Sequence, residues 1–162
     1  MISNQIMWTE IKKPVFMALN DLYQQTIKTH NKNPIGRNLE FPASHRAEGY
    51  NPSCGDELEI YLTFKEGEKI EQIGFSADAC AICTASASLM CAHAPGKTLL
   101  ELIEAVDQLN DSLNQKKEIK TESLSCLFAV SKHPSRINCA LLPWKTLNQA
   151  LQDSGTSYVE KE

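Results

Sequence analysis

The sequence predicts an α+β fold in which a small, mostly antiparallel sheet of about three strands packs against several helices. Two observations support this prediction. Apolar and polar residues alternate over residues 58–64, and after a turn at residues 66–68 a second stretch returns over residues 70–75, as in a hairpin. On both sides of this hairpin, apolar residues recur instead at intervals of three and four, which is typical of amphipathic helices.

The length and composition favour a single domain. The chain has 162 residues, of which 42% are hydrophobic, so it can bury a core of its own. We expect a folded core over about residues 14–152 and a polar tail over residues 153–162. The net charge of -4 argues against a nucleic-acid or anionic-membrane partner. Because we find neither a long apolar run nor a signal pattern, we expect a cytoplasmic location.

The elements before the hairpin are a helix and a strand. Pro14 can open the first helix, and its apolar residues recur at helical spacing from Val15 to Ile27. This helix should end by Asn33-Pro34, because a residue before proline avoids the helical region. A polar connection runs to about Pro42, and residues 43–51 are predicted as a strand.

Two helices are expected directly after the hairpin. The first begins near Cys80, where Asp78 or Ala79 can cap it, and Pro95-Gly96 breaks it. Thr98 and Glu101 fit a capping box for the second, whose apolar face extends to Leu109. Residues 110–121 are polar and rich in lysine, so we interpret them as a solvated connection.

The last part of the chain predicts two more helices. One covers about residues 122–132 and is stopped by His133-Pro134. Because proline damages a helix interior, Pro143 implies that the final helix is irregular in its first turn or begins only near Leu142. Cys139 is therefore expected at or just before a helix start.

Three of the six cysteines occupy similar positions, in a loop or near a helix start. Cys54 follows a run of turn residues, Cys80 lies at a helix start, and the hairpin should return the chain so that Cys54 and Asp56 lie beside Cys80. A thiol in the first turn of a helix faces unpaired N–H groups, which favour the thiolate. Together with Cys139, these residues offer three thiolates and a carboxylate, which is enough for tetrahedral zinc or an edge-exposed iron–sulfur cluster.

Three separated motifs resemble the NifU/IscU/SufU family of iron–sulfur cluster assembly scaffolds and related sulfur acceptors. They are N-P-S-C-G-D at 51–56, A-D-A-C-A-I-C-T-A-S-A-S at 77–88 and S-K-H-P-S-R-I-N-C-A-L-L-P-W-K-T-L at 131–147. The resemblance extends from about Leu19 to Leu151 in the right order. The chain is most similar to the SufU branch, because the stretch between Cys80 and Cys139 is long and Arg136 matches an arginine of that branch.

The resemblance implies the roles of the site residues. Cys54, Asp56, Cys80 and Cys139 would bind a zinc ion or a transient [2Fe–2S] cluster. Cys139 would accept persulfide sulfur from a cysteine desulfurase, with Arg136 supporting its thiolate. The product would pass to downstream iron–sulfur assembly proteins or apoproteins, so the protein would be a scaffold or a zinc-dependent sulfur acceptor rather than a conventional enzyme.

Asp56 and two departures from the family pattern give further expectations. As a hard oxygen ligand among thiolates, Asp56 is the ligand most suited to exchange. Asn138 stands where the IscU branch has a histidine and the SufU branch often has a lysine, so neither extra ligand is present. Cys83 replaces a serine and creates a C-x-x-C pair with Cys80. The chain also lacks the Leu-Pro-Pro-Val-Lys segment of IscU-like scaffolds, so we do not expect their Hsp70-type chaperone as a partner.

Other readings of these residues remain open. Cys83 is a spare ligand, a resolving thiol or, in the interpretation we favour, a packed side chain, since free cysteine is often buried. Cys91 and Cys126 fit the core, and the four histidines show no mutual metal spacing and are expected to be structural or on the surface. The whole site could instead hold a structural zinc in an interaction module. A dithiol oxidoreductase using Cys80 and Cys83 is the third alternative.

Overall fold

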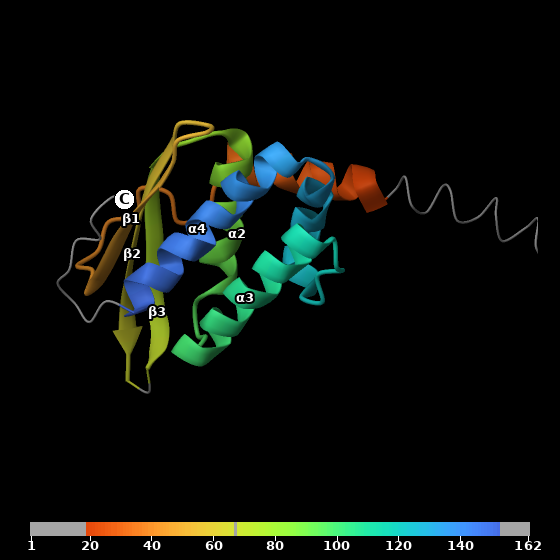
Figure 1. The fold of residues 1–162 in the computed structure, drawn as a ribbon. Helices are drawn as coiled ribbons and strands as arrows, with labels where there is room; N and C mark the ends of the chain where they lie inside the picture. Colours follow the sequence, from red (N-terminus) through yellow and green to blue (C-terminus); the bar gives the residue numbers. More distant parts are fainter. Residues whose placement is uncertain (1–18, 67, 153–162) are drawn as a thin grey trace, which may run out of the picture.

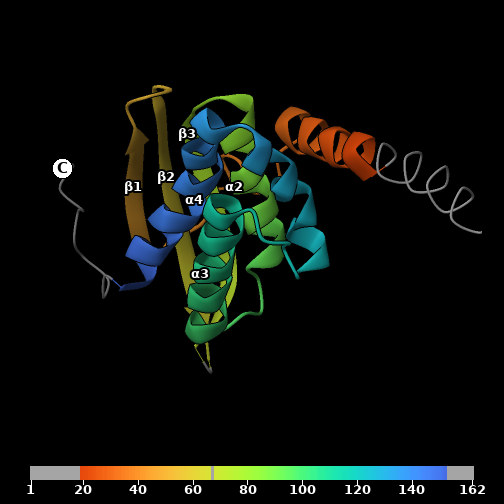
Figure 2. The same cartoon turned by 45° about the vertical axis from the view of Figure 1, so that its right-hand side comes forward.

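A computed structural model describes residues 19–66 and 68–152 and has the predicted α+β architecture. Its sheet contains β1 (His45–Asn51), β2 (Asp56–Lys65) and β3 (Lys69–Asp78) in the order β1-β2-β3, and both pairings are antiparallel. Helices α2 (Ala81–His93), α3 (Leu99–Gln115) and α4 (Pro134–Gln152) lie on one side of this sheet (Figures 1 and 2). None of the described helices is long and apolar enough to cross a membrane.

The predicted hairpin is formed by β2 and β3. Their register pairs Ile60 with Phe75 and Leu62 with Ile73, and shifts between Thr63 and Phe64. Every second side chain of β2, at Leu58, Ile60 and Leu62, faces the helices, because successive side chains of a strand point to opposite faces of the sheet. They join a core that includes Trp144, Leu141 and Leu147 of α4, all at most 1% exposed.

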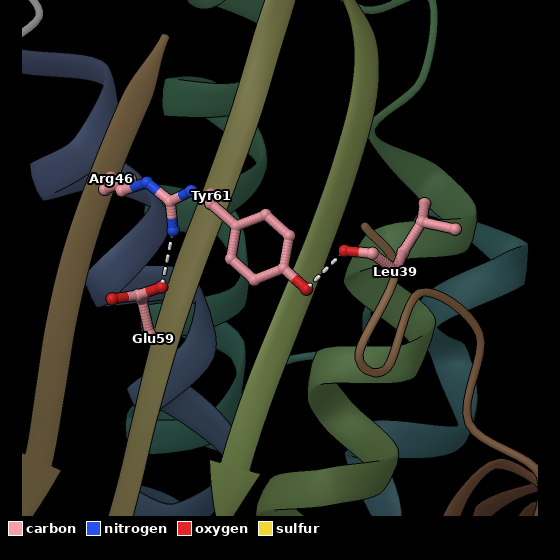
Figure 3. Close-up of polar contacts among 4 residues, drawn as sticks. All are labelled: Leu39, Arg46, Glu59 and Tyr61. Atoms are coloured by element: carbon pink, nitrogen blue, oxygen red, sulfur yellow. Dashed lines mark hydrogen bonds and ion pairs between the residues drawn. The ribbon is translucent and has the colours of Figure 1, made fainter. Parts of the chain in front are cut away.

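The opposite face of the sheet has its own polar cluster (Figure 3). Arg46 pairs with Glu59 at 2.8 Å, and its guanidinium lies 5.2 Å from the centre of the Tyr61 ring. The Tyr61 hydroxyl donates to the carbonyl of Leu39 at 2.7 Å and so ties the connection before β1 to the sheet. Tyr61 also covers Gly74, its partner on β3, where a Cβ atom would lie 2.8 Å from the ring.

The first helix and the polar connection lie where the sequence places them. A helix is described over residues 19–32, and its expected start at Pro14 lies outside the described residues, as does the expected tail at 153–162. The connection then runs along the free edge of β3. Asn38 N–H donates to the carbonyl of Phe75 at 2.8 Å, and Phe75 N–H donates to the carbonyl of Gly36 at 3.0 Å.

Helix α3 is longer than the sequence interpretation allowed. Its capping box is confirmed, since Glu101 N–H donates to Thr98 Oγ1 and Thr98 N–H donates to Glu101 Oε2. The helix continues to Gln115, because Ser112 and Leu113 extend the buried face one turn beyond Leu109 while Asp111 is exposed. The connection is therefore residues 116–121, and the expectation of a connection from residue 110 is wrong.

The start of the last helix also differs from the expectation. The segment over Glu122–Lys132, η1, is helical as predicted, but it is a 3₁₀ helix. Helix α4 begins already at Pro134, where a missing N–H costs nothing because the first turn has no carbonyl to bond it. Pro143 is accommodated inside this helix. Cys139 thus lies in the second turn of α4, and its expected place at a helix start is wrong.

Candidate metal centre

The turn between β1 and β2 and the first residue of β2 provide two of the predicted ligands, Cys54 and Asp56. Asn51 and Asp56 are cross-strand partners, so the turn between them consists of residues 52–55. Gly55 adopts a φ of +69°, which a residue with a side chain rarely takes, and this conformation links the Cys54 turn to β2. Asp56 is 0% exposed, whereas Cys54 is partly exposed. The loop, the start of α2 and the first turns of α4 gather at one end of the molecule (Figure 1).

Cys80 enters the site as the N-cap residue of α2. Its backbone is extended, with φ -67° and ψ 167°, and its N–H donates to Oδ1 of Asp56 at 2.8 Å. The cap is therefore Cys80 itself rather than Asp78 or Ala79. The hairpin brings Asp56 to the start of this helix, as the sequence predicted.

Helix α4 supplies Cys139, which is 0% exposed. Its thiol donates to the sulfur of Cys54 at 3.1 Å. Arg136, nearly one turn earlier, places its guanidinium nitrogen 3.8 Å from the sulfur of Cys54. Arg136 also interacts with Cys139, so it supports both thiols of the pair.

Three of the four predicted ligands form a compact set. The sulfur atoms of Cys54 and Cys139 and a carboxylate oxygen of Asp56 all lie within 4.8 Å of one another. The Cys80 thiol interacts with Asp56 and Cys139 but lies outside that set.

The donor set fits a thiophilic metal. Soft thiolates with one carboxylate suit zinc or an iron–sulfur centre. The carboxylate of Asp56 is fully buried, and the groups that bond it, the Cys80 N–H and the Asn51 amide, carry no formal charge. A buried carboxylate whose hydrogen-bond donors, among the described residues, are neutral favours a cation at this position.

Burial and hydrogen bonds act in opposite directions on the Asp56 carboxyl. Burial alone would raise its pKa, but the N–H of Cys80 and the side chains of Cys139, Asn51 and Cys80 hold the pKa below its ordinary value. The carboxylate is thus charged and available as a ligand. By contrast, burial raises the pKa of the Cys139 thiol, and its hydrogen bonds with Cys54, Asp56 and Cys80 raise it further.

Asn51 belongs to the site, and the sequence interpretation missed it. The residue is 7% exposed, and its side-chain nitrogen donates to Oδ2 of Asp56 at 3.2 Å and to the sulfur of Cys139 at 3.5 Å. The signal was present: a four-residue turn in a hairpin makes the residues on either side of it, 51 and 56, cross-strand partners.

The remaining cysteines are buried and do not belong to the three-residue ligand set. Cys83, Cys91 and Cys126 are all at most 4% exposed, and all six cysteines are free. Burial raises the pKa of Cys91 to about 12 and that of Cys126 to about 11. Burial also raises the pKa of Cys83, and the nearby Asp56, Cys80 and Cys54 add to this effect. These thiols are core side chains.

His30 and His93 make structural contacts. His30 Nδ1 lies 2.7 Å from the hydroxyl of Ser88, which also accepts the N–H of Ile35 at 2.8 Å. His93 lies against the Trp144 ring, with 6.1 Å between ring centres. The Ser88 contacts tie the first helix and its connection to α2, and the His93 contact joins α2 to α4.

Fold and site together define a class of protein: a small α+β protein with a candidate metal site, rich in thiols, where one end of the sheet meets two helices. Comparison with known proteins gives the family. Residues 22–158 match the NifU-like N terminal domain. The chain belongs to this family.

Relatives and solved structures agree with this family. The chain is 30% identical to the iron–sulfur cluster assembly scaffold protein IscU of Streptococcus pyogenes, over 86% of this chain and 88% of the relative. It is 33% identical to the zinc-dependent sulfurtransferase SufU of Bacillus subtilis, over 82% of this chain and 91% of the relative. A structure from Fervidobacterium islandicum, named as a candidate scaffold for the SUF system, is 34% identical with a TM-score of 0.68, covering 78% of this chain and 94% of that one.

Proposed function

We propose that this protein acts in iron–sulfur cluster assembly by accepting persulfide sulfur from a cysteine desulfurase at the site formed by Cys54, Asp56, Cys80 and Cys139. The observation that supports it most is the convergence of three side chains: Cys54 and Asp56, in a loop and at the start of the next strand, meet Cys139, which follows 85 residues after Cys54 in a helix. The family and its sulfurtransferase and scaffold members support the same conclusion.

The proposed reaction is a thiol–persulfide exchange. The acceptor thiolate attacks the outer sulfur of the persulfide on the desulfurase, the S–S bond of that persulfide breaks, and the desulfurase cysteine leaves as a thiolate. The acceptor then carries the new S–S bond, and no net oxidation occurs. The step needs a thiolate that the donor can reach.

Cys139 is the proposed acceptor, by its place in the family motif. Its side chain is fully buried, so transfer to it requires the Cys54 loop or the start of α2 to move. Cys54 is the second candidate, because it is partly exposed, lies 3.1 Å from Cys139 and has Arg136 beside it. In either case the transferred sulfur ends beside the same metal ligands.

The four ligand residues would hold a zinc ion or a transient [2Fe–2S] cluster. Bound zinc would stabilise the thiolate form of its cysteine ligands, which burial otherwise disfavours at Cys139. The partial exposure of Cys54 and Cys80 leaves the site accessible on one side. That accessibility favours exchange of sulfur over a closed, purely structural zinc site.

The first experiment measures metal and acid-labile sulfide on protein purified without oxygen, followed by desulfurase turnover with and without the protein. About one zinc per chain without sulfide, together with faster turnover, supports the sulfur acceptor. Iron with matching sulfide supports a scaffold that holds the nascent cluster. Tightly bound zinc with no effect on any desulfurase would overturn the proposal in favour of a structural site.

A further inference from the structure

Asn51 connects two of the proposed ligands through one amide group. It is the last residue of β1 and pairs across the strand with Asp56, the first residue of β2. Its nitrogen lies 3.2 Å from Oδ2 of Asp56 and 3.5 Å from the sulfur of Cys139. One planar NH₂ group thus faces a carboxylate from its own hairpin and a thiol from α4.

The orientation of this amide follows from its neighbours. If the amide were reversed, its carbonyl oxygen would face the charged carboxylate of Asp56, and a buried NH₂ group would lose its acceptors. The two hydrogens of the NH₂ group can serve the two acceptors at the same time. Oδ1 of Asp56 is already bonded by the N–H of Cys80, so the Asn51 bond at Oδ2 fixes the second oxygen.

We infer that Asn51 is a positioning residue of the metal site, holding the Asp56 carboxylate and the Cys139 sulfur at the spacing that a metal requires. The inference rests on the metal site of the proposed function and not on sulfur transfer. A hydrogen bond from an outer residue orients a ligand and alters the electron density on its donor atom. At Cys139 the N–H···S bond stabilises negative charge on sulfur.

The experiment compares Asn51→Leu and Asn51→Ser with the wild-type full-length chain. Leucine has nearly the shape of asparagine but no donors, and serine keeps a polar group that is too short to reach both ligands. Ser88→Ala is the matched control, because Ser88 is a fully buried, hydrogen-bonded residue of α2 whose partners are His30 and Ile35 rather than the ligands. Zinc affinity is measured by competition with a chromophoric chelator, and cobalt(II) replaces zinc for absorption spectra.

We expect both Asn51 variants to bind zinc about 10–100-fold more weakly, the usual effect of losing a partner of a metal ligand. Their thiolate-to-cobalt charge-transfer band should move to longer wavelength, because the sulfur loses its N–H donor. Ser88→Ala should lower stability but leave the affinity and the spectrum unchanged. The affinities and spectra are compared under conditions in which the same fraction of each protein is folded. This comparison separates the positioning role from a general loss of stability.

Unchanged zinc affinity and an unchanged cobalt spectrum in both Asn51 variants would overturn the inference. An equal shift in Ser88→Ala would also overturn it, since the effect would then come from general loosening. If the wild type binds zinc as expected but accepts no sulfur, the proposed function fails and the inference stands. If the wild type binds neither ion, the metal site and the inference fail together.

Discussion

The sulfur atoms of Cys54 and Cys139 lie 3.1 Å apart, although 85 residues separate them in the sequence. One belongs to a partly exposed loop and the other to a buried helical turn. A donor approaching from solvent therefore meets Cys54 before Cys139. This relationship makes the order in which the two thiols react the main question about the site.

Asp56→Ala tests whether the carboxylate is the exchanging ligand. When the carboxylate leaves a metal it keeps hydrogen bonds from the Cys80 N–H and the Asn51 amide, so it can open a position at low cost. Without it, we expect bound metal or cluster to be trapped and transfer to a recipient to slow. The measurement compares Asp56→Ala with the wild type in two rates: metal release to a chelator and transfer to a recipient protein.

Asp107→Ala, on the exposed side of α3, is the control for the loss of one negative charge. If Asp56→Ala released metal and transferred sulfur at the wild-type rates, the carboxylate would have no role in exchange.

Cys83→Ala separates the packing interpretation from the dithiol alternative. Cys83 is 0% exposed, and loss of its sulfur should lower the free energy of unfolding by about 0.5–3 kcal/mol, as for other core truncations. Sulfur acceptance and zinc content should stay at wild-type levels. Cys91→Ala, on the same helix, is the matched control, and loss of sulfur acceptance in the Cys83 variant alone would favour a resolving thiol.

Ser86→Ala should weaken the contact between α2 and α4. The Ser86 hydroxyl donates to the carbonyl of Ala140 at 2.5 Å and accepts the indole N–H of Trp144 at 3.0 Å. Removing it leaves the buried indole N–H without its acceptor, which costs about 1–3 kcal/mol. Urea denaturation measures this loss. Ser125→Ala, whose hydroxyl is exposed, should change stability far less, and equal losses would show that the buried bond is not the cause.

His30 should make stability depend on pH. Burial lowers its pKa below the ordinary 6.5, so the unfolded chain takes up a proton before the folded chain does. Stability is therefore full above pH 6.5 and falls as the pH drops through the unfolded and then the folded pKa. Denaturation of the metal-free protein at a series of pH values from 8 to 5 gives the slope of the free energy of unfolding against pH.

His30→Gln keeps an acceptor for the Ser88 hydroxyl but cannot titrate. The free energy of unfolding of this variant should therefore depend less on pH than that of the wild type. His93 has a lowered pKa as well, through burial and the nearby Lys97, so part of the pH dependence should remain in this variant. A slope in His30→Gln equal to that of the wild type would assign the pH dependence elsewhere.

The sequence predicted the sheet because local patterns determine it. The alternation over residues 58–64 and the turn that follows need no long-range information, and β2 and β3 form there. The same hairpin explains why Asp56 was correctly placed beside Cys80. The prediction that Cys139 joins this site depended on the family motifs, because no local pattern connects this residue to the loop.

The errors have equally local causes. Pro143 was treated as a helix breaker, but packing of α4 against α2 and the sheet outweighs the lost hydrogen bond, so the helix starts nine residues before this proline, at Pro134. The polar residues after Leu109 hid the buried Leu113, which extends α3. Asn51 was missed because an asparagine before proline reads as a turn residue, and only the strand register reveals its partners.

The measurement that tests the account most directly is the location of sulfur after incubation with a cysteine desulfurase and cysteine. Peptide mass spectrometry under non-reducing conditions should find one added sulfur on Cys139 in the zinc-loaded wild type. Cys139→Ser should abolish stable loading, while Cys126→Ala, a buried thiol outside the ligand set, should load normally. Sulfur found on Cys54 alone would show that this partly exposed thiol, and not Cys139, is the acceptor. The absence of added sulfur on every ligand cysteine would contradict the account.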